Sequence, residues 1–285
     1  MKKVLAIHKA PAEHWVGNGF PVRSMFSYQT HGQEISPFLL LDHAGPAYFE
    51  KTAQARGVGQ HPHRGFETVT IVYNGEVAHR DSTGQGGVIK AGDVQWMTAG
   101  AGIIHDEFHS AAFRASGGVL EMVQLWVNLP AEHKLTTPGY QEIKSEQIPV
   151  VAMPGGAGRV RVIAGNYADK GGAAATHSPM QVWDIAMHGG AETTFTLPEG
   201  WNVMLLLLAG DLKVNNITLQ QSQLAILDSE GTAVVLKAGS DTRLLLLSGE
   251  PLHEPIVGYG PFVMNTQAQI RQAISDYQNG KFGQI

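Results

Sequence analysis

The sequence contains no cysteine. Disulfide bonds, thiolate metal sites, iron–sulfur clusters and cysteine nucleophiles are therefore excluded, and any metal must bind to nitrogen and oxygen ligands. Charged residues are also scarce, at 16% of the 285 residues. No run of lysine or arginine indicates a nucleic-acid surface, and the 20 basic residues are outnumbered by 25 acidic ones. We therefore do not expect direct binding to nucleic acid.

Long apolar runs are missing as well. The longest one, VMLLLLAG, begins at Val203, whereas a membrane-spanning helix needs about 20 apolar residues. The apolar stretch from Val4 to Ile7 follows a basic start but is too short for a signal peptide. We therefore expect a cytoplasmic protein, or a nuclear one in a eukaryote, that does not enter the membrane.

Glycine and alternating apolar residues are plentiful. The 34 glycines and the 43% hydrophobic content suit a turn-rich β protein. Between residues 60 and 128, polar and apolar residues alternate with a period of two, which indicates β strands. Asn74-Gly75 predicts a hairpin turn within this region. Many short strands at regular spacing predict an antiparallel barrel or sandwich.

The remainder of the chain predicts a second barrel. The segment from residue 145 to 180 is rich in glycine, alanine and proline and is interpreted as a junction. Beyond it, LLLLAGDLKVNN resembles the earlier VTIVYNGEVAHR in its strand, glycine turn and strand. A capping box at residues 266–269, helical spacing from Ile270 to Tyr277, and Gly280 as a C-terminal cap predict one closing helix.

We accordingly predict three regions. Residues 1–130 form an N-terminal metal-binding barrel, residues 131–180 form a junction with loops, and residues 181–285 form a C-terminal barrel without metal that ends in the helix. The second barrel contains histidines, but none is paired with a second ligand along a strand; these are His177, His188 and His253. It is expected to be a structural or interaction domain.

Two short segments carry candidate metal ligands. His61 and His63 are two residues apart, as are His105 and Glu107, so alternation places each pair on one face of a strand. Imidazole and carboxylate groups bind borderline and hard divalent metals. Two strands on opposite walls of a small barrel can bring four such ligands to one ion and leave coordination positions open. By parity alone, Glu67 is as acceptable a carboxylate as Glu107.

A single His-x-His pair is more often incidental than a metal site, and it is the joint occurrence of the two pairs that favours one. Three further histidines lack matching partners and are interpreted as supporting, loop or surface residues: His43, His79 and His109.

These segments resemble the pirin family of the cupin superfamily. The resemblance is carried by HPHRGFETV and AGDVQWMTAGAGIIHDE, and it extends to PFLLLDHAGP, MVQLWVNLP and GEPLHEPIVGYGPFVMNT, so it covers essentially the whole chain. It implies an all-β bicupin, in which two antiparallel jelly-roll barrels are followed by a C-terminal α-helix and the N-terminal barrel binds a metal.

The resemblance also implies a ligand set. In pirins the fourth ligand is the glutamate two residues after the histidine of the second motif, which gives His61, His63, His105 and Glu107 here. Glu67 then takes an outer position from which it orients a ligand imidazole.

The activity implied by the resemblance is that of a quercetin 2,3-dioxygenase. Such an enzyme uses O2 to open the central ring of a flavonol with loss of carbon monoxide, and Glu107 would act as both ligand and catalytic base. Fe(II) is the metal that the resemblance favours, although Ni, Cu, Mn or Zn would suit the same ligands. We expect Val69, Ile71 and Met97 to line the substrate pocket, unless they are ordinary barrel core.

Two other functions share the same ligands. The first is an iron-dependent, redox-sensing regulatory protein that acts through protein partners as a transcriptional co-regulator. The second is a zinc or manganese cupin isomerase, which would not need oxygen.

Overall fold

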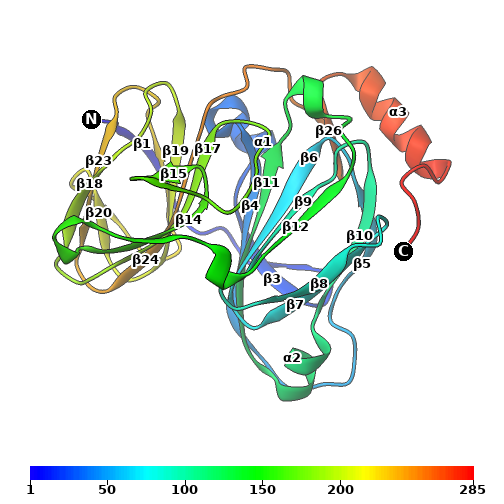
Figure 1. Cartoon of the computed structure of the whole chain (residues 1–285), viewed down its shortest axis with the longest axis horizontal. Helices are drawn as coiled ribbons and strands as arrows, with labels where there is room; N and C mark the ends of the chain where they lie inside the picture. Colours follow the sequence, from blue (N-terminus) through cyan, green and yellow to red (C-terminus); the bar gives the residue numbers. More distant parts are fainter. The chain divides into compact units, whose positions relative to one another are not determined.

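The computed structural model describes residues 1–285, most of which lie in or between antiparallel β strands (Figure 1). The chain divides into two compact units. Unit 1 comprises Met1–Pro11, Gln33–Pro37 and Glu146–Leu252, and unit 2 comprises Ala12–Gly32, Phe38–Ser145 and His253–Ile285. None of the helices has the length and apolar character needed to cross a membrane.

Unit 2 consists of a seven-stranded and a four-stranded sheet. The larger sheet has the order β12 (Gly139–Ile143), β9 (Val94–Thr98), β6 (Phe66–Asn74), β11 (Gly118–Asn128), β4 (Phe38–Phe49), β3 (Phe20–Ser27) and β2 (His14–Val16). The smaller sheet has the order β5 (Gly57–His63), β10 (Ile103–His109), β7 (Glu76–Asp81) and β8 (Gly86–Lys90). Adjacent strands are antiparallel throughout both sheets.

Unit 1 repeats this plan. Its seven-stranded sheet has the order β1 (Val4–His8), β22 (Leu224–Leu227), β19 (Asn202–Ala209), β24 (Thr242–Gly249), β17 (Met180–Met187), β14 (Gly158–Ala164) and β13 (Val150–Ala152). Its four-stranded sheet has the order β18 (Glu192–Thr196), β23 (Ala233–Ala238), β20 (Leu212–Val214) and β21 (Ile217–Leu219). The space between them is filled by a continuous apolar core that includes Trp183, Phe195 and Leu205.

Short elements complete the chain. The helices α1 (Tyr28–His31) and α2 (Ala111–Ser116) are brief, as are the 3-10 turns η1 (Gly32–Ile35), η2 (Ala131–His133), η3 (Ser145–Gln147) and η4 (Pro154–Gly156). Two small hairpins are formed by β15 (Asn166–Tyr167) with β16 (Lys170–Gly171) and by β25 (Val257–Tyr259) with β26 (Phe262–Met264).

The predicted internal repeat is confirmed by the strand order. The connected strands β19 and β20 occupy the same places in unit 1 that β6 and β7 occupy in unit 2. The predicted hairpin at Asn74-Gly75 is wrong, because β6 and β7 lie in different sheets and do not pair. A turn is nevertheless present there: β6 ends at Asn74, β7 begins at Glu76, and Gly75 has a φ of 83°. This left-handed conformation is one that glycine adopts without steric cost.

The two ends of the sequence do not follow the expected division at residues 130 and 180. In unit 1, β1 is the edge strand and pairs with β22. In unit 2, the same edge position is held by β12, which pairs with β9. Residues 253–285, including His253, belong instead to unit 2. The segment expected to be a loop-rich junction also contributes β12 to unit 2 and β13 and β14 to unit 1. Alternation identifies a strand but does not specify which sheet edge it joins.

The predicted C-terminal helix is present as α3 (Gln267–Gln278), and Thr266 and Gln269 form the capping box. Its buried residue Ile270 packs with Phe262 and Phe282 in an apolar cluster of unit 2. Arg64, next to His63 in sequence, donates a 2.8 Å hydrogen bond to Asp276 of this helix. The helix therefore supports the barrel that carries the candidate ligands.

Candidate metal centre

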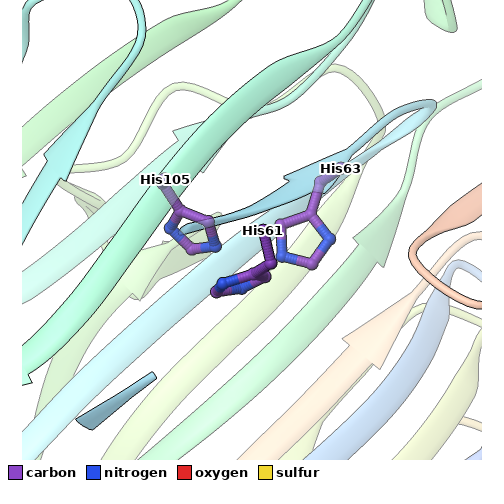
Figure 2. Close-up of side chains that lie close together, drawn as sticks. All are labelled: His61, His63 and His105. Atoms are coloured by element: carbon purple, nitrogen blue, oxygen red, sulfur yellow. The ribbon is translucent and has the colours of Figure 1, made fainter. Parts of the chain in front are cut away.

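Three histidines converge on one point inside unit 2. His61 and His63 come from β5 and His105 from β10, and in the antiparallel register His105 lies opposite His61. The candidate ligand nitrogens of the three rings all lie within 4.8 Å of one another. Figure 2 shows the rings pointing toward one another. The two strands do not lie on opposite walls, as we expected, but are neighbours in the four-stranded sheet, and their pairing brings the histidines together.

Glu107 lies in an adjoining group. A register shift between β10 and β5 separates His105 from Glu107. The Glu107 carboxylate accepts hydrogen bonds from Thr70 (3.3 Å) and from Gln124 (3.0 Å). It forms a second potential metal-binding group with His79 and His105. The structure thus brings the three predicted histidines together and places the predicted carboxylate beside them, in a group that shares His105.

Two of the histidines, His63 and His105, have the protonation state that metal binding requires. Burial lowers the pKa of His63 and that of His105 well below 6.5, and the neighbouring imidazoles lower both further. A neutral imidazole keeps one nitrogen lone pair available for a metal. In His61, Nδ1 lies 2.8 Å from the carbonyl oxygen of Gly59 and must donate to it, which leaves the lone pair on Nε2.

Two ring nitrogens of these histidines lack any hydrogen-bond partner, Nδ1 of His63 and Nε2 of His105. Nε2 of His105 is buried and makes no hydrogen bond. Leaving a buried polar atom unsatisfied costs about 1–3 kcal/mol. A positive ion at this position would satisfy it, so the residues present fit a metal bound by nitrogen ligands.

Other histidines near the site are buried and have specific contacts. His79 hydrogen-bonds to Asp81 at 3.1 Å and lies 3.3 Å from His105, atom to atom. His109 donates to the carbonyl oxygen of Gly19 at 2.8 Å. His43 lies 3.5 Å from Glu121. These three histidines are supporting residues rather than surface or loop residues. The His-x-Asp spacing of His79 and Asp81 on β7 is the sequence signal that would have identified His79.

Glu67 is hydrogen-bonded to the larger sheet. Its carboxylate accepts a 2.7 Å hydrogen bond from Thr98 on β9, and its expected role of orienting a ligand imidazole stays a prediction. Burial raises the pKa of Glu67 to about 7, although Thr98 partly offsets the effect. The carboxyl group is thus tied to the wall of the seven-stranded sheet.

A cavity of about 30 Å³ reaches His61 and Glu107. The apolar part of its wall is formed by Val16, Phe20, Val22, Val58 and Met122. The polar residues Asp42 and Gln124 also line the cavity. The expected pocket residues Val69, Ile71 and Met97 are instead fully buried core. Parity alone did not reveal that β2 and β3, far from the motifs in sequence, cover the site.

Unit 1 has a different interior. Its strands β18 and β23 hold the places of β5 and β10, but they place Phe195, Val234 and Leu236 in the apolar core. Apolar side chains therefore fill the space that the histidines occupy in unit 2.

The sequence and structure match known proteins along almost their full length. A Pseudomonas aeruginosa protein named "Putative quercetin 2,3-dioxygenase" is 57% identical over 282 residues, which is 99% of each chain. A pirin-like protein of Solanum lycopersicum is 38% identical, over 99% of this chain and 92% of its own. The crystal structure of an Acinetobacter baumannii quercetin 2,3-dioxygenase is 54% identical and superposes with a TM-score of 0.97, covering 100% of this chain and 99% of that one.

The two units also match family descriptions. Residues 19–127 match Pirin, and residues 182–283 match the Pirin C-terminal cupin domain. The resemblance read from the motifs is thereby confirmed, and with it the fold of two cupin domains. The chain belongs to the pirin family.

Proposed function

We propose that unit 2 binds one divalent metal ion through His61, His63, His105 and Glu107, and that the protein is a quercetin 2,3-dioxygenase that uses O2. The observation that carries the proposal is the cluster of three histidines in which Nε2 of His105 is buried without a hydrogen-bond partner. The 57% identical relative named as such a dioxygenase supports the choice of reaction. Fe(II) is the proposed ion, since nitrogen and carboxylate ligands with open positions suit it.

A bound divalent ion would supply a Lewis acid that lowers the pKa of the 3-hydroxyl group of a flavonol. The chain supplies the proton acceptor. Glu107 reaches the same cavity as His61, and its two oxygens are oriented by Thr70 and Gln124. A carboxylate held in this way can accept the hydroxyl proton from a substrate in the cavity.

The cavity sets a condition on substrate entry. A volume of about 30 Å³ is close to that of one water molecule and far below that of a flavonol. We propose that the hairpin of β2 and β3, which supplies Val16, Phe20 and Val22 of the apolar wall, moves outward when a flavonol binds. The apolar lining by Val16, Phe20 and Val22 suits a flat aromatic ring once the hairpin has moved.

The proposal is tested by metal content and oxygen uptake together. The purified protein is expected to contain about one metal ion per chain and to consume O2 with quercetin. His61→Ala is expected to lose most of the metal, and Glu107→Gln to lower oxygen uptake at least about 100-fold, as removal of a ligand and base does. Inductively coupled plasma mass spectrometry and an oxygen electrode provide the measurements.

His188→Ala is the matched control, because this histidine is exposed and lies in unit 1. It is expected to leave both quantities unchanged. Full metal content in His61→Ala would contradict the site. A metal-loaded protein that consumes no O2 with quercetin or other flavonols would contradict the reaction but not the site.

A further inference from the structure

A chain of buried hydrogen bonds leads from a carboxylate to the ligand His105. Asp81 Oδ2 lies 3.1 Å from His79 Nε2, and His79 Nδ1 lies 3.3 Å from His105 Nδ1. The side chains of His79 and Asp81 are completely inaccessible to solvent. The register of β7 against β10 creates this arrangement, because Asp81 pairs with His105 and His79 pairs with Glu107.

Asp81, the first group in this series of hydrogen bonds, decides where each proton lies. An ionised carboxylate can only accept, so His79 must donate from Nε2 to Asp81. The amide nitrogen Nε2 of Gln95 lies 3.4 Å from His79 Nδ1 and can only donate, so Nδ1 of His79 is an acceptor and His105 must donate to it from its own Nδ1. This leaves the lone pair of His105 on Nε2, the atom that is buried without a partner.

Asp81 is itself held rigidly by the turn that follows β7. Its other oxygen, Oδ1, accepts hydrogen bonds from the backbone N–H of Thr83 (2.8 Å), the hydroxyl of Thr83 (2.6 Å) and the backbone N–H of Gln85 (3.3 Å). Burial raises the pKa of Asp81, but the hydrogen bonds from His79 and Thr83 outweigh it and keep that pKa below its ordinary value. The carboxylate therefore stays ionised and turned toward His79.

His79 could instead be read as a metal ligand, because it lies in a potential group with His105 and Glu107. Both of its nitrogens, however, are already engaged: Nε2 by Asp81, and Nδ1 by His105 and by the amide nitrogen of Gln95. No lone pair remains for an ion. Its place between a carboxylate and a candidate ligand is that of a positioning residue.

We propose that Asp81 and His79 are positioning residues that lock His105 as the tautomer with its proton on Nδ1, so that Nε2 is prepared to bind the metal. This inference rests on the proposed metal site in unit 2. Outer partners of this kind typically change metal affinity 10- to 100-fold. Without them, His105 would have to change tautomer and orientation whenever an ion bound.

The test uses Asp81→Asn in the full-length protein. If the amide oxygen keeps the Thr83 contacts, the amide N–H₂ faces His79 and must donate to Nε2, which reverses the protons along the chain. His105 then carries its proton on Nε2. Competition with a chelator under anaerobic conditions is expected to show Fe(II) bound 10- to 100-fold more weakly than by the unaltered protein.

Asp106→Asn is the matched control. Asp106 lies on β10 next to His105 in sequence and is as buried as Asp81. It forms an ion pair with Arg80 at 2.8 Å and takes no part in the hydrogen bonds that link Asp81, His79 and His105. It is expected to bind Fe(II) as the unaltered protein does. Equal Fe(II) affinity in the Asp81→Asn and Asp106→Asn variants would overturn the inference.

A second measurement needs no variant and no metal. Nitrogen-15 NMR of the imidazole rings in the metal-free protein is expected to show His105 protonated at Nδ1 and unprotonated at Nε2. A proton on Nε2 would overturn the inference even if Asp81→Asn failed to fold. If the unaltered protein bound no metal, the proposed function would fail, whereas the tautomer of His105 would still be decided by NMR.

Discussion

Glu67 and Glu107 are both buried in unit 2, with exposed fractions of 1% and 3%, but they have different surroundings. Glu107 lines the cavity and accepts hydrogen bonds from two side chains. Glu67 is hydrogen-bonded to Thr98, and burial raises its pKa to about 7 from 4.5. A charge on Glu67 therefore costs stability, because burial removes it from water.

This cost predicts how Glu67→Gln changes stability with pH. Between pH 4.5 and about 7, the folded state keeps a proton on Glu67 that the unfolded state releases, so the free energy of unfolding falls as the pH rises. The loss is complete above pH 7 and amounts to at most about 3 kcal/mol. Glu67→Gln removes it, so the metal-free variant is expected to be more stable than the unaltered protein at pH 8 but not at pH 4.5.

Urea unfolding at the two pH values measures the difference. The exposed Glu230 provides the control, since Glu230→Gln is expected to change stability by less than about 0.5 kcal/mol at either pH. An equal effect of Glu67→Gln at both pH values would show that the charge on Glu67 is not the cause.

At the scale of elements, the β2–β3 hairpin closes the site. Asn18 in its turn accepts a hydrogen bond from the backbone N–H of Gly57 (2.8 Å) and donates one to the carbonyl oxygen of Ala55 (3.2 Å). Gly17 contacts Gly57 so closely that no side chain would fit at this position. These contacts fasten the hairpin to β5, the strand that carries His61 and His63.

Asn18→Ala is expected to loosen the hairpin. Each lost hydrogen bond contributes about 0.5–1.5 kcal/mol, so opening becomes easier by roughly one to two powers of ten at most. Hydrogen exchange of the backbone amides in β2 and β3 should become faster, and the KM for quercetin should fall because less free energy is spent on opening. Faster exchange without any change in KM would show that the hairpin does not control entry.

The cap of α3 offers a control for this variant. Thr266→Ala removes the capping box of a helix on the same unit, which typically costs about 1 kcal/mol. Although Thr266→Ala should lower stability by a similar amount, it is expected to leave the hydrogen exchange of backbone amides in the β2–β3 hairpin unchanged.

At the scale of the whole molecule, each unit is completed by a segment from the opposite end of the chain. Residues 253–285 bury Val263 against Leu39 and Phe66 of unit 2. They also bind the backbone of Arg64, next to His63: its N–H donates to the carbonyl oxygen of Pro261 (3.3 Å), and its carbonyl oxygen accepts from the N–H of Val263 (3.1 Å). At the other end, Lys2 donates to the carbonyl oxygens of Trp201, Asp228 and Ser229 in unit 1.

Removing residues 253–285 is therefore expected to destabilise unit 2, although these residues follow most of unit 1 in sequence. Deleting residues 1–11 should instead destabilise unit 1. Calorimetry with and without Fe(II) distinguishes the unfolding of unit 2 from that of unit 1, because a bound metal stabilises only the unit that holds it. A shortened chain lacking residues 253–285 that kept the Fe(II)-dependent shift in melting temperature would contradict this expectation.

The sequence alone was sufficient for features that depend on local spacing. Period-two alternation predicted the strands, the helical spacing from Ile270 predicted α3, and the His-x-His and His-x-Glu pairs identified the histidines that converge. Side-chain direction along a strand or helix is fixed by backbone geometry, so neighbours in sequence reveal it.

The tertiary structure decided what depends on pairing between distant segments. It placed β1 in unit 1 and residues 253–285 in unit 2, closed the cavity with β2 and β3, and set His79 and Asp81 behind His105. It also tied Glu67 to β9. The register and the choice of sheet edge follow from the packing of the whole barrel, and this information is not contained in the spacing within any one strand.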